Sequence, residues 1–83
     1  MDSSVFKEVT SRFNKIIAHY QHSPEIVKSL LEEEYNYQCD LNWTAFGIVY
    51  KNTSEQDWFL LLHCHFTLLD KIELAYYNAC AKL

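Results

Sequence analysis

The stretch TSEQDWFLLLHCHFTLLDKIELAYYNA, residues 53–79, decides the fold class. It begins with a polar run that holds two pairs at the spacing of a capping box or a near variant of it, Thr53 with Gln56 and Ser54 with Asp57. Large or apolar residues then recur at helical spacing along one stripe: Trp58, Leu61, Leu62, Leu68, Leu69, Ile72, Ala75, Tyr76 and Ala79. The pattern predicts a helix from about residue 55 to near the C-terminus.

Two further helices are predicted upstream of this stretch. The first segment places Phe6, Val9, Phe13, Ile16, Ile17 and Tyr20 at helical spacing. Ser23-Pro24-Glu25 then marks a helix start, because serine caps, proline suits the first turn and glutamate favours the positive end of the helix dipole. The link between the two helices is short, which predicts an antiparallel hairpin.

Residues 41–51 are ambiguous, since Trp43, Phe46, Ile48 and Val49 have strand-like preferences. The apolar positions do not alternate, and no other segment resembles a partner strand. We therefore expect a short buried helix capped by Asp40, and the alternative is a single strand that pairs across a dimer or with another protein. The sequence as a whole predicts one compact all-α domain of four helices over residues 1–83.

Charge excludes one class of partner and favours another. The net charge is −4, and residues 25–40 alone carry a net −4. Because no basic run is present to neutralise phosphates, direct binding to nucleic acid is not expected. The acidic patch Glu32, Glu33 and Glu34 instead favours a protein partner with a basic surface, although such residues are also typical of a solvated helix face.

The start of the chain, Met1-Asp2-Ser3-Ser4, lacks the basic and apolar regions of a signal peptide. The cysteines Cys39, Cys64 and Cys80 are an odd number without CxxC spacing, so we expect reduced thiols and a cytoplasmic location. The run Trp58–Leu62 is far too short for a membrane span, and no membrane association is expected.

Neither a metal centre nor catalysis is predicted. His63, Cys64 and His65, with His19, His22, Cys39 and Cys80 elsewhere, are the candidate zinc ligands. Consecutive helical residues point about 100° apart, so the first three diverge. Cys64 has no base and orienting group converging on it, and Gly47 is the single glycine, so no phosphate loop exists. We expect no cofactor and no enzymatic activity.

Two polar residues fall where the helical pattern expects apolar ones. His65 lies at the centre of the main stripe of the last helix, and Glu34 lies within the face of Val27, Leu30 and Tyr37 on the second helix. One interpretation is a hydrogen-bonded core histidine and a glutamate at a fraying helix end. The other is that His65 and Glu34 meet, or that each faces a partner protein, because a buried charge must be paired or neutralised.

A second stripe on the last helix is the predicted recognition surface. It consists of Phe59, His63, Phe66, Asp70, Glu73 and Tyr77, about 100° around the helix from the first stripe. Aromatic rings with polar neighbours are typical of protein interfaces, and the alternative is that another helix of the same chain covers this stripe.

Together these features predict a small acidic protein-interaction module, such as an adaptor, an inhibitor or an immunity-type antagonist. Self-association into a homo-oligomer such as a homodimer is also expected, because thirteen aromatic rings are difficult to bury in one small core. Two alternatives remain: a metal- or redox-responsive regulator that uses His and Cys, and a non-catalytic subunit of a larger complex.

Overall fold

The fold is all-α, as the periodicity predicts. A computed structural model describes residues 4–83, which form helices α1 (Ser4–His19), α2 (Pro24–Lys51) and α3 (Trp58–Ala81), with a short 3-10 turn, η1 (Glu55–Asp57), before α3. No strand occurs within these residues. The opening residues 1–3, on which the expectation about a signal peptide partly rests, lie outside the described part of the chain.

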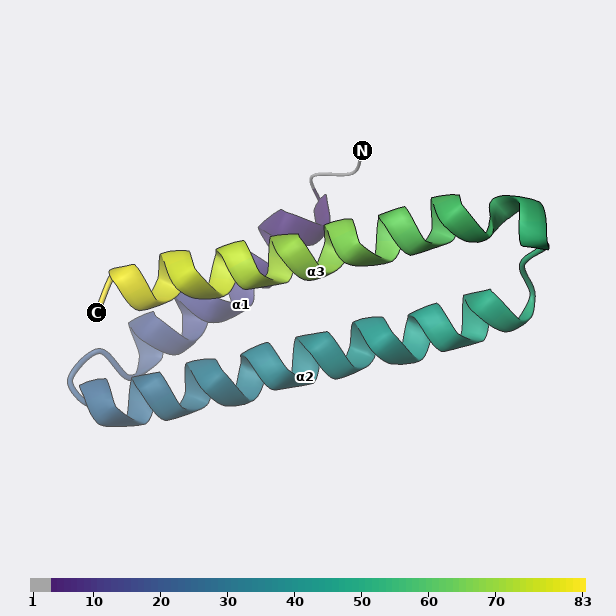
Figure 1. Ribbon diagram of the computed structural model, residues 1–83. Coiled ribbons are helices and arrows are strands. Elements are labelled where there is room, and N and C mark those ends of the chain that lie inside the picture. Colours follow the sequence, from purple (N-terminus) through teal and green to yellow (C-terminus); the bar gives the residue numbers. More distant parts are fainter. Residues whose placement is uncertain (1–3) are drawn as a thin grey trace.

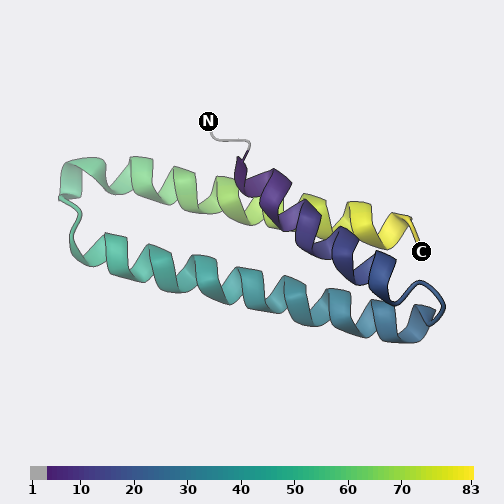
Figure 2. The same ribbon diagram turned by 180° about the vertical axis from the view of Figure 1, so that it is seen from behind.

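Helices α2 and α3 form a long hairpin, and α1 covers only one half of it (Figure 1). Viewed from behind, α1 begins near the middle of the hairpin and runs obliquely across it to the end where α2 begins (Figure 2). We call residues 4–40 and 69–83 the three-helix half and residues 41–68 the arm. The molecule is therefore elongated, about 50 × 20 × 15 Å, rather than compact as expected.

All three helices contribute to one small hydrophobic core in the three-helix half. Its buried apolar residues are Val9, Phe13, Val27, Leu31, Ile72, Ala75 and Ala79. The rings of Tyr35 and Tyr76, with centroids 4.5 Å apart, pack beside this core, and Phe13 lies 6.1 Å from Tyr76. Every residue of the predicted main stripe of α3 is buried or half-buried, so that interpretation is confirmed.

The prediction of four helices is wrong, because α2 continues without a break through Asp40 to Lys51. Asp40 is exposed in the helix interior and caps nothing. Trp43, Phe46 and Tyr50 stand three and four residues apart, so a helix brings their rings to one side, and the rings of Phe46 and Tyr50 stack at 5.9 Å. Tertiary packing against α3 thus overrides the strand-like preferences, and the strand alternative is wrong as well.

The helix ends are placed almost as predicted, with different bonding. Ser23 is the N-cap of α2 and Pro24 its first residue, but the Ser23 side chain makes no capping bond; its carbonyl accepts the Val27 N–H at 3.0 Å. Ser54 Oγ donates to Asp57 Oδ2 at 3.1 Å before α3. Thr53 Oγ1 instead donates to the Val49 carbonyl at 2.7 Å, which closes the end of α2.

Candidate interaction surface

The predicted recognition stripe is exposed along the whole of α3. Phe59, Phe66 and Tyr77 expose 74%, 51% and 60% of their surface, and His63, Asp70 and Glu73 between them are exposed as well. No helix of the described chain covers the stripe, so the alternative of a covered face is wrong. On α3, Ile72, Ala75 and Ala79 belong to the core that α1 closes, and Cys64 and Leu68 continue their row along the helix. The stripe lies about 180° around α3 from this row.

The acidic patch divides into an exposed and a structural part. Glu32 and Glu33 are exposed on α2. The Glu34 side chain is only 18% exposed; its Oε1 lies 3.8 Å from Nη1 of Arg12 and accepts a hydrogen bond from Gln38 Nε2 at 2.9 Å. Glu34 therefore ties α2 to α1, and only its two neighbours are free to meet a partner.

His65 is the one buried polar residue of the described chain, at 3% exposure. Its ring centroid lies 4.2 Å from that of Trp43, 4.3 Å from that of Phe46 and 5.4 Å from that of Phe66. Neither ring nitrogen has a hydrogen-bond partner within residues 4–83. Burial lowers the pKa of the imidazole from its ordinary value, so the neutral form is favoured.

Neither of the two environments predicted for His65 within its own chain is therefore observed, and contact with a partner protein stays a prediction. The imidazole is not hydrogen-bonded in the core, and it does not meet Glu34, whose carboxylate is engaged by Arg12 and Gln38. The nearest polar contact is to the backbone, where Asn42 Nδ2 donates to the His65 carbonyl at 3.3 Å. An aromatic enclosure replaces the expected polar partner.

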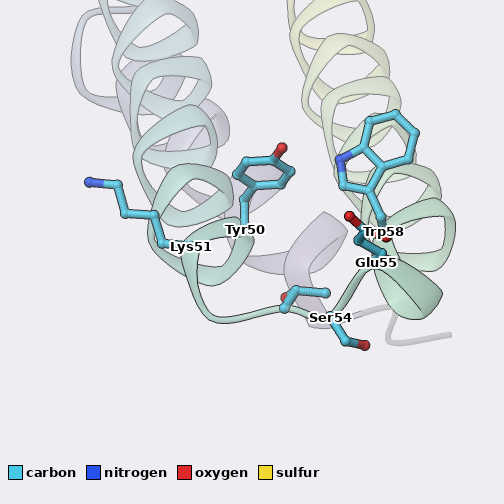
Figure 3. Close-up of a pocket in the computed structure, with 6 residues that line it drawn as sticks. Tyr50, Lys51, Ser54, Glu55 and Trp58 are labelled. Carbon is cyan, nitrogen blue, oxygen red and sulfur yellow. The ribbon is translucent and has the colours of Figure 1, made fainter.

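The arm is the feature that the sequence analysis missed. It holds a hollow of about 110 Å³ lined by Asn42, Ala45, Phe46, Val49, Leu61, Cys64, His65 and Leu68. A second, open hollow of about 460 Å³ lies at the tip, where Tyr50 points toward α3 and Trp58 stands across from it (Figure 3). One signal could have found the arm: residues 41–50 and 58–69 contain no Asp, Glu, Lys or Arg.

The candidate metal ligands do not converge. His63 and Cys64 are exposed on α3 whereas His65 is buried, as expected for consecutive helical residues. No group of three His, Cys, Asp or Glu side chains within residues 4–83 is placed to hold a metal ion. Cys39, Cys64 and Cys80 are free thiols, and burial raises the pKa of Cys39, which disfavours its reactive thiolate.

Searches among known proteins add no assignment. No known protein family, curated protein or solved structure matches this chain. Among the described helices, none combines the length and apolar character needed to cross a bilayer.

Proposed function

We propose that this chain is a non-enzymatic interaction module of the cytoplasm that acts by binding another protein through the recognition stripe of α3. The observation that supports the proposal is the exposure of Phe59, Phe66 and Tyr77 on one helix face, with His63, Asp70 and Glu73 between them. Large rings are costly to leave in water, and interfaces use such rings as anchors with polar residues around them.

The charges beside the rings set the kind of partner. Asp70 and Glu73 lie within the stripe, and Glu32 and Glu33 are exposed on α2. A basic partner surface is attracted by these carboxylates, which accelerate encounter and select the partner more than they add affinity. This chemistry suits an adaptor, an inhibitor or an immunity-type antagonist, each of which acts by occupying a surface.

The test compares two exposed apolar residues of α3, one inside the stripe and one outside it. Wild-type protein is immobilised, source-cell lysate is passed over it, and the retained protein is identified and purified. Its dissociation constant is then measured for the wild type, for Phe59→Ala and for Leu60→Ala, since Leu60 is 67% exposed but lies about 100° around α3 from Phe59. We expect Phe59→Ala to weaken binding about 30-fold or more, the effect of a hot-spot residue.

Leu60→Ala is the matched control and should change the affinity by less than about threefold, because residues outside a hot spot contribute little. Both variants should melt close to the wild type, since both side chains are exposed. Equal binding by the wild type and Phe59→Ala would refute the assignment of the stripe. Capture of no protein other than this chain itself would refute the proposed function.

A further inference from the structure

We call the strip between α2 and α3 on the side where α1 packs the groove; in the arm it holds the hollow of about 110 Å³. On α2 its wall is a row of residues three or four apart: Val27, Leu31, Glu34, Gln38, Asn42, Ala45 and Val49. On α3 the corresponding row is Ala79, Ala75, Ile72, Leu68, Cys64 and Leu61. Residues at this spacing share one face of a helix, so each row passes from the three-helix half into the arm without changing sides.

Helix α1 fills only the first part of this groove. Val9 and Phe13 pack with Val27, Leu31 and Ile72 in the core, and Arg12 reaches Glu34. With 16 residues against 28, α1 is about 24 Å long and α2 about 42 Å, so roughly 18 Å of groove lies beyond the start of α1. The hollow of about 110 Å³ over His65 lies in this uncovered part.

We propose that the uncovered groove of the arm is the interface of a symmetric dimer, in which it packs against the same groove of a second copy of this chain. The two arms lie antiparallel, so that four helices share one core and the tip of each arm reaches the start of α1 in the other protomer.

Charge distinguishes a second copy from other occupants. Each chain carries a net −4, yet residues 41–50 and 58–69 have no charged side chain. Two such surfaces meet without like-charge repulsion, whereas a basic partner finds no carboxylate in the groove to pair with. The groove also lies on the opposite side of α3 from the recognition stripe, so this proposal does not depend on the proposed function.

His65 provides an independent observation at the same place. Its imidazole lines the hollow, is 97% buried by its own chain, and has no hydrogen-bond partner within residues 4–83. Because the nitrogens are already shielded from solvent, an apolar cover over the hollow removes no hydrogen bond to water there. The hollow therefore suits an uncharged, apolar occupant such as the same surface of a second copy.

The area suits a weak dimer. Two helices side by side are about 20 Å across, so an overlap of about 18 Å buries on the order of 700 Å² in total, the size range of weak and transient interfaces. Leu41, Val49 and Leu60 at its rim are about half exposed or more in the single chain and supply apolar contact. Dimerisation should consequently depend on protein concentration.

The test uses the full chain and measures its mass by sedimentation equilibrium over a wide range of protein concentration. Ala45→Glu places a carboxylate in the groove at an exposed helical position, and Ala18→Glu makes the same change at an exposed position of α1. A second readout is the alkylation rate of each thiol by mass spectrometry. Cys64 is exposed in the groove, whereas Cys39 and Cys80 pack against the core and serve as internal references.

We expect the wild type and Ala18→Glu to approach twice the chain mass as concentration rises, while Ala45→Glu stays monomeric. Alkylation of Cys64 should slow as the dimer forms, and only in the proteins that dimerise. A wild type that is monomeric throughout would overturn the proposal. Three other results would place self-association on another face and would overturn the proposal too. They are a dimer that persists in Ala45→Glu, a dimer in which Cys64 stays equally reactive, and a dimer that is lost in Phe59→Ala.

Discussion

The three-helix half and the arm are built from the same two helices, yet they differ completely in burial. Every buried apolar residue of the described chain lies in the three-helix half, and the only buried residue of the arm is His65. The difference comes from α1, which packs against one half of the hairpin and does not extend over the other. Burial here depends on the presence of a third helix and not on how apolar the segments are.

The less buried region of the molecule is also the one with fewer charged residues. The arm is almost free of charge, with Lys51, Glu55 and Asp57 only at its tip, whereas the acidic patch and the Arg12–Glu34 pair belong to the three-helix half. A helix that is apolar all round is typical of a buried element. The arm therefore has the sequence of a covered segment and the exposure of an uncovered one, which is why we assign it an interface.

The largest expected effect contrasts one phenylalanine from each region. Phe13 is fully buried in the three-helix half, and Phe66 is half exposed in the arm. Phe13→Ala should cost about 3–5 kcal/mol of unfolding free energy, a large fraction of the about 5–15 kcal/mol typical of a domain. Phe66→Ala should cost about 1 kcal/mol, mainly its ring contact with His65.

Urea denaturation followed by circular dichroism measures both variants at low protein concentration, where association contributes least. Similar losses for Phe13→Ala and Phe66→Ala would break the comparison, because they would mean that the arm is packed as tightly as the three-helix half in the single chain.

The fold of the three-helix half could be predicted from the sequence, and the arm could not. Val9, Phe13 and the main stripe of α3 stand at helical spacing because one face of each helix meets a core, so periodicity reports the packing directly. In residues 41–51 every side of the helix carries apolar residues, such as Trp43 on one side and Ile48 on another. No single face stands out, and the periodicity that identifies a helix is lost.

The next effect comes from His65, whose imidazole is buried without a hydrogen-bond partner in the described chain. The side chains that line its hollow or enclose its ring include no carboxylate and no ammonium or guanidinium group. His65→Phe keeps a planar ring and removes the unpaired nitrogens. We expect it to raise the unfolding free energy at neutral pH by about 1–3 kcal/mol, the usual cost of an unsatisfied buried group.

The same residue sets a pH dependence. Burial lowers the pKa of His65 in the folded chain below the value of about 6.5 that an unfolded chain has. The unfolded state thus binds a proton at a higher pH, and stability present above about pH 6.5 is lost as the pH falls toward the lowered pKa. Denaturation at several pH values measures how the unfolding free energy changes with pH. The decrease toward low pH should appear in the wild type and in the control His63→Gln, and it should be absent in His65→Phe. A flat wild-type profile would contradict it.

The recognition stripe could be proposed from sequence because rings and polar residues share one helix face, whereas the groove could not. Asn42, Ala45 and Cys64 form its wall, and small or polar residues at these positions carry no pattern of their own. Their meaning depends on where α1 begins, a property of the assembled chain. Similarly, Glu34 resembles its neighbours Glu32 and Glu33 in sequence, and only the position of Arg12 separates it from them.

The smallest expected effect tests whether the arm is helical throughout. Gly47 lies inside α2, its φ is not positive, and a Cβ added there would meet nothing within 4 Å. Gly47→Ala should therefore raise the unfolding free energy by about 0.5–1 kcal/mol, since glycine loses more conformational freedom than alanine in a helix. Denaturant titration measures the change, and far-ultraviolet circular dichroism should show no loss of helix. A lower stability would mean that α2 is interrupted at residues 41–51, where the strand-like preferences lie, and the continuous arm would have to be abandoned.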